Sequence, residues 1–258
     1  MWKFAAARAT GKSHTRAGLP CQDRFRCVTL FNATHLVAAL ADGAGSASMS
    51  EKGAHIAVEA TVAHIETAVS GSSPDLLNLI RQAAFSGREA VFHFAREEGI
   101  DPRQLASTLL AVVVTPAGGA ALQVGDGLIV ARDSGNEWNW KLWPQRGEFA
   151  NTTVFLTDNF FAEVVKVKSL DADTTDVALM SDGLEGLGLH YSSRTVHVPF
   201  FQAMFRPIIN AEGDSEITPV SQQLKTLLAS DEISNRTDDD VSLILATRRS
   251  DDGSVFSP

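Results

Sequence analysis

The chain has 258 residues, of which 44% are hydrophobic, and its mean hydropathy of -0.01 is typical of a protein with a sizeable core. Its formal net charge of -9 argues against nucleic acid as a partner, because phosphate backbones are bound through basic stripes and the sequence contains none. The longest apolar run, 109–114, is too short to cross a bilayer, and the first residues lack the apolar stretch of a signal peptide. We therefore expect a cytoplasmic protein with no membrane partner.

No linker rich in Pro, Ser or Gly divides the chain, so we expect one domain at 1–247, followed by a polar, frayed tail at 248–258. Two cysteines, Cys21 and Cys27, are too few for a disulfide framework and have no second pair to form a zinc site. We expect both to be reduced thiols with no catalytic role.

Short runs of β-forming residues, many of them separated by Gly, Asn or Asp, recur along the chain. The predicted strands are 2–9, 24–31, 34–41, 107–115, 119–125, 127–132, 137–143, 152–157, 164–168, 176–181 and 241–247. Most neighbours in this series look like hairpins. The segment 137–143 places Trp138, Trp140 and Leu142 on one strand face, which we expect to pack in the core.

Two longer segments, 50–69 and 74–98, have the 3.6-residue apolar period of helices, and Pro74 suits the first turn of the second one. A third helical region is expected between about 200 and 230, interrupted by Pro207. Because strands follow strands and helices follow helices, the pattern predicts a layered α+β domain and not a βαβ alternation.

Four aspartates stand where an apolar run ends or begins: Asp42, Asp126, Asp182 and Asp239. A carboxylate at the rim of a buried strand loses hydration, so several that converge would repel one another unless a cation held them together. A glycine directly after Asp42 and after Asp182 lets the backbone turn sharply, which can bring a carbonyl oxygen against the same cation. The pattern predicts a metal site built from strand ends.

Two of these aspartates also have structural interpretations. Asp126 and Gly127, between two predicted strands, form the commonest hairpin-turn dipeptide, so a type I′ turn fits them as well as a site does. The run Asp238-Asp239-Asp240 would fit a solvated acidic loop if it stood alone.

Other catalytic motifs fit the sequence poorly. Gly43-Ala44-Gly45 follows a strand, but Ser48 occupies the third position of a dinucleotide fingerprint, and Asp42 would face the pyrophosphate. The sequence contains neither a P-loop nor the G-x-S-x-G elbow of a Ser-His-Asp hydrolase.

Eight short motifs follow one another between 11 and 247. They are Gly11-Lys12-Ser13-His14, Pro20-Cys21-Gln22-Asp23, Ala41-Asp42-Gly43-Ala44-Gly45-Ser46-Ala47, Ser107-Thr108-Leu109, Val124-Gly125-Asp126-Gly127, Gly147-Glu148-Phe149-Ala150-Asn151-Thr152-Thr153, Met180-Ser181-Asp182-Gly183-Leu184 and Asp239-Asp240-Val241-Ser242-Leu243-Ile244. In this order they resemble the motifs of the PP2C-type metal-dependent protein phosphatases, most of all the bacterial branch with Gln-Asp in its first motif. No single motif is specific, but the ordered set is.

The resemblance implies a four-layer α-β-β-α sandwich, with two antiparallel sheets flanked by helices and two Mn²⁺ or Mg²⁺ ions in a cleft at one end. Asp42 would bridge both ions, and the carbonyl of Gly43 would bind one of them. Asp182 and Asp239 would complete the shell of the second ion, and Asp23 would reach the first through water. Asp42, Asp182 and Asp239 are therefore the expected catalytic residues. An all-oxygen ligand set also favours Mg or Mn over Zn.

The implied activity is hydrolysis of phosphoserine and phosphothreonine in proteins, opposing a Ser/Thr kinase. Two ions about 3.5–4 Å apart lower the pKa of a bridging water and clamp the phosphoryl group, so attack is direct and forms no phosphoenzyme. The charge of the ions would let an acidic protein bind an anionic substrate. Substrate choice is expected to lie in 184–234, which separates two of the aspartates.

Several positions depart from the family pattern. Gln22 stands where an acidic residue is usual, and Gly18 stands where many members place an arginine that holds the phosphate, although Arg16 is nearby. Ala44 replaces a histidine that some members use as leaving-group acid, and Asp240 replaces the common Asn of the last motif. A lost phosphate clamp would cost a few kcal/mol of transition-state binding and slow the turnover.

Two of these departures, Gln22 and Gly18, leave a second class of function open, a catalytically silent PP2C-like module that binds a phosphoprotein or a partner kinase. A third class, a nucleotide-binding oxidoreductase, would require NAD to raise the melting temperature, and we expect no such shift. Asp101 is a candidate ligand for a third, weak metal ion, at an offset that is not the usual one.

Overall fold

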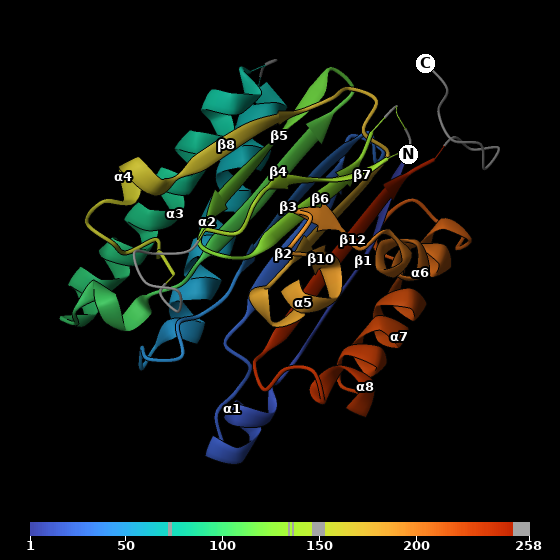
Figure 1. The fold of residues 1–258 in the computed structure, drawn as a ribbon. Coiled ribbons are helices and arrows are strands. Elements are labelled where there is room, and N and C mark those ends of the chain that lie inside the picture. Colours follow the sequence, from blue (N-terminus) through green and yellow to red (C-terminus); the bar gives the residue numbers. More distant parts are fainter. Residues whose placement is uncertain (72–73, 134, 136, 146–152, 250–258) are drawn as a thin grey trace.

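The computed structural model describes residues 1–71, 74–133, 135, 137–145 and 153–249 (Figure 1). Within this part of the chain, two five-stranded antiparallel sheets pack face to face. One sheet contains, in order, Arg24–Leu30 (β2), His35–Ala41 (β3), Leu109–Thr115 (β4), Gly118–Val124 (β5) and Lys166–Leu170 (β8). The other contains, in order, Trp2–Ala9 (β1), Val241–Arg248 (β12), Asp176–Met180 (β9), Leu128–Arg132 (β6) and Trp138–Leu142 (β7).

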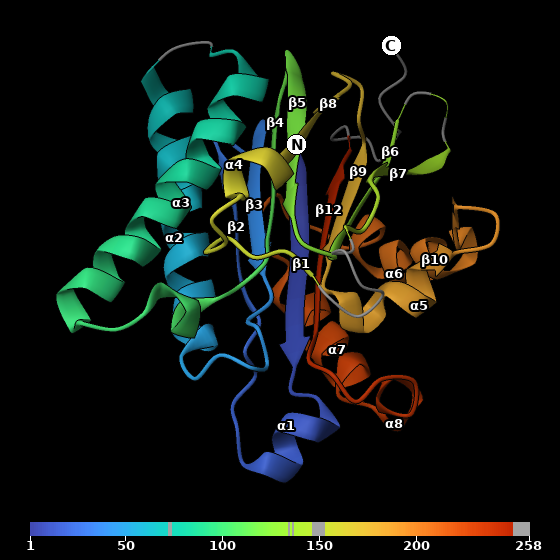
Figure 2. The ribbon, with the colours of Figure 1, turned by 60° about the vertical axis from the view of Figure 1, so that its left-hand side comes forward.

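Helices cover both outer faces of the sheets (Figure 2). Ser50–Gly71 (α2) and Leu76–Glu98 (α3) lie on the β2–β8 sheet, whereas Glu185–Gly188 (α5), Val198–Ile209 (α6) and Thr218–Leu228 (α7) lie on the β1–β7 sheet. The short elements are Lys12–Ala17 (α1), Pro102–Leu105 (η1), Phe161–Val164 (α4), Asp182–Leu184 (η2), Leu189–His190 (β10), Thr195–Val196 (β11) and Asp231–Ser234 (α8). The predicted α+β sandwich of four layers is confirmed.

Strand β3 shows why the central strands read as unbroken apolar runs. Leu36 and Leu40 pack between the two sheets, whereas Val37 and Ala41, on the opposite face, pack under the helices. Both faces of the strand are therefore buried, and successive side chains that point in opposite directions are all apolar.

The helices begin and end close to their predicted positions. Asp75 caps α3 by accepting hydrogen bonds from the backbone N–H groups of Leu77 and Asn78, so the helix begins at Leu76. Pro74, predicted in the first turn, therefore lies before the helix. The third helical region is divided into α6, α7 and α8, and Phe201 and Phe205 of α6 pack on Trp138 as a cap over the sheet.

Three strand predictions need correction. The described part of the predicted strand 152–157 is irregular backbone, and the segment predicted as 164–168 is helical up to Val164, with β8 following. Trp138 and Leu142 do not share a face, because a β-bulge shifts the pairing of β7 with β6. Trp138 packs under the helices, and Leu142 packs between the sheets.

The link between β5 and β6 is not a hairpin turn. Strand β5 pairs with β4 and β8, whereas β6 pairs with β7 and β9 in the other sheet. Gly125-Asp126-Gly127 therefore crosses from one sheet to the other. Gly125 has a φ of +101°, and any side chain at this position would collide with Thr108, so glycine is required.

The beginning of the predicted polar tail belongs to the sheet. Arg248 is the last residue of β12 and pairs with Trp2, and the buried Arg249 forms an ion pair with Asp176. The rest of that tail, 250–258, lies outside the described residues. None of the helices in the described part of the chain is long and apolar enough to cross a membrane.

Candidate metal centre

Asp42, Asp126, Asp182 and Asp239 line one pocket of about 430 Å³. Asp42 follows β3, Asp126 joins β5 to β6, Asp182 follows β9, and Asp239 precedes β12. The other described lining residues are Gly43, Ala44, Gly45, Ser46, Thr108, Thr153 and Phe155. All four strand-end aspartates recognised in the sequence thus meet, and they come from both sheets.

Asp23, directly before β2, is fully buried beside this pocket. Neither oxygen of its carboxylate has a hydrogen-bond partner within ordinary geometric limits. Burial raises the pKa of Asp23 to about 6, although the nearby hydroxyl groups of Ser242 and Ser181 oppose part of that rise. A buried carboxylate with so little hydrogen-bond compensation is costly, and a bound cation would remove that cost.

The carboxyl groups also act on one another. Burial, followed by the charges of Asp23, Asp182 and Asp239, raises the pKa of Asp42 well above its ordinary value. Burial, followed by the charges of Asp126 and Asp239, raises the pKa of Asp182 to about 7. Asp42 is close enough to both Asp23 and Asp182 to affect the pKa values of both carboxyl groups. It is therefore the natural shared member of the cluster.

The loop after β3 is fixed by backbone contacts. The N–H of Asp42 donates to Thr108 Oγ1 at 2.9 Å, and the N–H of Thr108 donates to the carbonyl of Asp42 at 2.8 Å. A Cβ on Gly43 would come within 2.9 Å of Ser50 and 3.0 Å of the carbonyl of Gln22. Only glycine fits there, and the residue forms an isolated bridge with Ser107 that holds the loop at the pocket.

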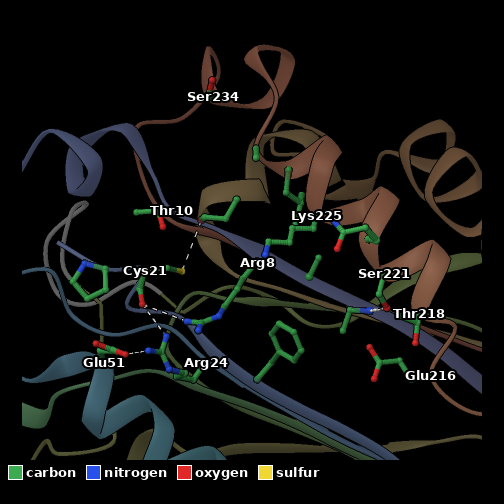
Figure 3. Close-up of a pocket in the computed structure, with 18 residues that line it drawn as sticks. Arg8, Thr10, Cys21, Arg24, Glu51, Glu216, Thr218, Ser221, Lys225 and Ser234 are labelled. Atoms are coloured by element: carbon green, nitrogen blue, oxygen red, sulfur yellow. Dashed lines mark hydrogen bonds and ion pairs between the residues drawn. The ribbon is translucent and has the colours of Figure 1, made fainter. Parts of the chain in front are cut away.

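Two arginines, Arg8 and Arg24, bind the backbone of the segment that leads to Asp23, and Figure 3 shows their contacts with Cys21. The guanidinium groups of Arg8 and Arg24 both donate to the carbonyls of Cys21 and Asp23, at distances of 2.5 to 3.3 Å. Arg24 also pairs with Glu51. These residues line a second, larger pocket of about 890 Å³ between β1, β2 and α7. The backbone of Asp23 is thus positioned by side chains that do not touch its carboxylate.

The donor set fits a hard divalent cation. Every ionisable group among the described lining residues is a carboxyl group, and buried oxygens of Asp23 and Asp182 have no hydrogen-bond partner. As the side chains stand, no three His, Cys, Asp or Glu residues of the described chain are gathered closely enough to hold one ion. The carboxyl groups are instead spread over the pocket.

A family model, protein phosphatase 2C, matches residues 10–229. The chain belongs to the protein phosphatase 2C family. Serine/threonine-protein phosphatase 3 of Escherichia coli (strain K12) is 32% identical over 249 residues, which cover 95% of this chain and 98% of that protein. The family and this relative identify the chain as a protein serine/threonine phosphatase, as the motifs predicted.

Solved structures agree with this protein phosphatase 2C fold. A bacterial serine phosphatase superposes with a TM-score of 0.64 at 16% identity, covering 97% of this chain and 99% of that one. The catalytic domain of the serine threonine protein phosphatase PstP, in complex with 2 manganese ions, gives 0.62 at 17% identity, covering 95% and 97%. At these identities the likeness concerns the fold.

The structure places several of the residues that depart from the protein phosphatase 2C pattern. Gly18 ends α1 in the left-handed conformation, with a φ of +68°, so a glycine cap occupies the place of the usual arginine. Arg16 is exposed on α1 and does not line the pocket, whereas Ala44 does. Asp101 caps η1, where it accepts from the N–H of Arg103, and it is not a lining residue.

The carboxylate of Asp240 contacts residues near the N-terminus of the chain. Its carboxylate accepts from the N–H groups of Gly11 and Gln22, and its Oδ2 lies 2.9 Å from His14 Nδ1. Sequence reasoning recorded both motifs but did not bring them together. Arg8 was also missed, because its contacts are with backbone carbonyls and carry no motif. The motif at 147–153 lies outside the described residues, except for Thr153.

Neither cysteine forms a disulfide within the described chain. Burial raises the pKa of Cys21 to about 12, and the nearby carboxylates of Asp23 and Asp240 add to this effect. A thiol with so high a pKa is a poor nucleophile at neutral pH.

Proposed function

We propose that this phosphatase hydrolyses phosphoserine and phosphothreonine in proteins with the help of two divalent ions, Mn²⁺ or Mg²⁺. The observation that carries the proposal is the cluster of carboxyl groups around Asp42, which has raised pKa values and no cationic side chain among the described lining residues. Such a cluster is unfavourable by itself and becomes favourable around cations. The manganese ions in the similarly folded PstP domain support this choice of cofactor.

The position of each carboxylate suggests its role. Asp42 would bind both ions, because it is close enough to both Asp23 and Asp182 to affect the pKa values of both carboxyl groups. Asp23, with the carbonyl of Gly43, would serve the first ion, and Asp182 with Asp239 would serve the second. Asp126, which the sequence left open between turn and site, lines the same pocket and stands close enough to Asp182 to raise its pKa, so we add it as a further ligand.

The chain would contribute binding and orientation to the reaction. Two divalent ions, when bound, supply a nucleophilic water of lowered pKa and neutralise the charge of the phosphoryl group. No lysine or arginine is among the described lining residues, so the anionic substrate depends on the ions for its electrostatic attraction. The exposed Ser46 can add a hydroxyl donor at the rim of the pocket.

The partner would be a phosphoprotein, with a Ser/Thr kinase as the opposing enzyme. The segment from α5 to α8 is the expected place of substrate selection. Its β10–β11 hairpin presents the exposed Tyr191 next to Trp143, with the guanidinium of Arg194 4.9 Å from the Trp143 ring. An aromatic surface with a cation on the same outer side as α5 suits contact with a protein chain.

The silent binding module remains the second candidate, because a glycine cap at Gly18 and an alanine at Ala44 remove two side chains that act on the phosphate in other members. In that case the protein would bind metal and a phosphoprotein without turning it over.

The deciding experiment measures hydrolysis of p-nitrophenyl phosphate against Mn²⁺ concentration. Wild type, Asp42→Ala and Asp182→Ala are compared with Asp214→Ala, a control in the exposed loop before α7. We expect saturable activity in wild type and control, and a loss on the order of 10³-fold in the two pocket variants. A folded wild-type protein that binds Mn²⁺ but hydrolyses neither this ester nor a phosphopeptide would leave the silent module as the function.

A further inference from the structure

Hydrolysis of a phosphoserine ester has a second chemical requirement besides the nucleophile. As the bond between phosphorus and the seryl oxygen breaks, the oxygen takes up the electron pair and becomes a strongly basic alkoxide, which leaves far more readily with a proton. The described lining residues of the pocket include carboxyl and hydroxyl side chains but no histidine, lysine or cysteine. Ala44 offers no proton where the loop enters the pocket.

His14 stands beside this loop in a fixed orientation. It lies on α1, at the end of the sheets that carries the metal centre (Figure 2). Its Nδ1 is 2.9 Å from Oδ2 of Asp240, and the two side chains are only 12% and 1% exposed. Asp240 is itself held by the backbone N–H groups of Gly11 and Gln22. A carboxylate that is anchored in this way fixes the imidazole ring and leaves its other nitrogen free to exchange a proton.

The other ring nitrogen of His14 faces the pocket loop. If Gly45 carried a Cβ, that atom would lie 4.0 Å from His14 Nε2. Apart from the residues adjoining Gly45, no other atom of the described chain would come within 4 Å of it. Gly45 is an exposed lining residue of the pocket. Nε2 therefore lies next to an exposed glycine that lines the pocket, and no side chain at position 45 stands between them.

We propose that His14 is the proton donor to the leaving serine or threonine, with Asp240 as the residue that positions it. This rests on the proposed function. The water releases one proton to solvent as its oxygen forms a bond to phosphorus. The bond from phosphorus to the seryl oxygen breaks, and that oxygen keeps the electron pair and takes the proton from His14 Nε2. Neutral His14, whose Nδ1 stays next to Oδ2 of Asp240, then regains a proton from solvent.

The arrangement also explains why two motifs at opposite ends of the chain occur together. His14 belongs to the first motif and Asp240 to the last, and neither is needed as a metal ligand. An asparagine at 240 would present either an amide donor or a neutral acceptor to the ring, so it would stabilise the imidazolium less than a carboxylate does.

The test exploits the difference between leaving groups. The His14→Asn variant keeps an amide donor near the position of Nδ1 and removes Nε2, while p-nitrophenolate, unlike a serine alkoxide, departs without a proton. We expect the ratio of kcat on a phosphoserine peptide to kcat on p-nitrophenyl phosphate, both at saturating Mn²⁺, to fall about 100-fold. His14→Gln should lower the ratio in the same way, and His93→Asn, exposed on α3, is the matched control.

The outcomes separate this inference from the function on which it rests. An equal loss on both substrates, or no loss on either, would overturn the role of His14 as proton donor. Wild-type protein that is inactive on both substrates with Mn²⁺ would instead refute the proposed function. Circular dichroism shows whether each variant is folded, and Mn²⁺ titration shows whether it binds metal. Because His14→Asn and His14→Gln have side chains of different length, the test still holds if one of them misfolds.

Discussion

The aspartates at the two ends of strand β9 are in opposite environments. Asp176, the first residue of β9, is fully buried and has a partner for each oxygen. The partners are Arg132, Arg249, Thr175 and Thr247, at 2.6 to 2.9 Å. Asp182, just beyond the other end, faces the carboxyl groups of the pocket, and its buried Oδ1 has no hydrogen-bond partner.

The difference distinguishes a charge that serves the fold from one that we propose serves the reaction. A buried carboxylate is tolerated when donors surround it, and Asp176 uses its donors to join β6, β9 and β12. At Asp182 the chain leaves the charge uncompensated, which lowers the stability of the metal-free protein. A loss of stability in the metal-free protein is expected where a cation completes the site, because active-site groups are arranged to bind a ligand and not to stabilise the fold.

The largest effect is expected from removing the uncompensated charge. In Asp182→Asn the activity should fall on the order of 10³-fold, because an amide is a poor ligand for a divalent ion. The same substitution should raise the melting temperature of the metal-free protein by several degrees, because a repelling charge is gone. Activity assays with Mn²⁺ and thermal unfolding in EDTA measure the two. A lower melting temperature in EDTA would contradict the comparison.

The opposite result is expected at Asp176. Asp176→Asn leaves two arginines next to a neutral group, and the free energy of unfolding should decrease by about 3–5 kcal/mol. Enzyme that stays folded should keep its kcat, since Asp176 is at the far end of the strand. Urea unfolding measures the loss, and Asp133→Asn, which breaks the more exposed pair with Lys141, serves as control with an expected cost below about 1 kcal/mol. If the two substitutions lowered the free energy of unfolding equally, Asp176 would not differ from a more exposed ion pair.

The pH dependence of the metal-free protein follows from the raised pKa values. Asp23 titrates at about 6 and Asp182 at about 7 in the folded state, against an ordinary value of 3.8. Between these values the folded protein holds more protons than the unfolded one, so the free energy of unfolding must fall as the pH rises. A shift of about two units at Asp23 corresponds to about 3 kcal/mol.

Urea unfolding in EDTA at about pH 5 and about pH 7.5 tests this sign. Wild type should lose stability over that interval, Mn²⁺ should restore it at the higher pH, and Asp182→Asn should show a shallower decline. Stability that rises with pH in EDTA would mean that the carboxyl groups of the pocket are compensated without metal.

The sequence predicted the fold where local patterns decide it. The buried strands β3 and β4 read as apolar runs, the helices α2 and α3 have a clear period, and four strand-end aspartates marked the pocket. Elements as short as α1 and the β10–β11 hairpin leave too few residues for a period. One inserted residue in β7 turned Leu142 to the other face, which a two-residue alternation cannot reveal.

The remaining parts of the site depend on contacts between distant segments. Whether Asp126 sits in a hairpin or in a crossover depends on the sheet that β5 and β6 each join, and nothing near Asp126 specifies this. The contact of His14 with Asp240 joins the first motif to the last. Gly18 was read as a missing arginine, although the backbone requires a glycine to end α1. Each of these facts is visible only after the chain has folded.

The smallest effect is expected from the residues that hold Asp23 by its backbone. In Arg8→Gln the carbonyls of Cys21 and Asp23 lose one guanidinium but keep that of Arg24, so the carboxylate of Asp23 should be displaced only slightly. We expect the Mn²⁺ affinity to fall about tenfold, the lower limit for residues that orient a metal ligand, with little change in kcat at saturating Mn²⁺. Calorimetric titration and the Mn²⁺ dependence of activity measure this affinity.

Lys225→Gln is the control for Arg8→Gln, because Lys225 lines the same pocket without contacting these carbonyls. If both variants bind Mn²⁺ like wild type, Arg24 alone positions Asp23. Asp23 and Asp176 would then differ only in the groups that contact their carboxylates, and not in how their backbones are held.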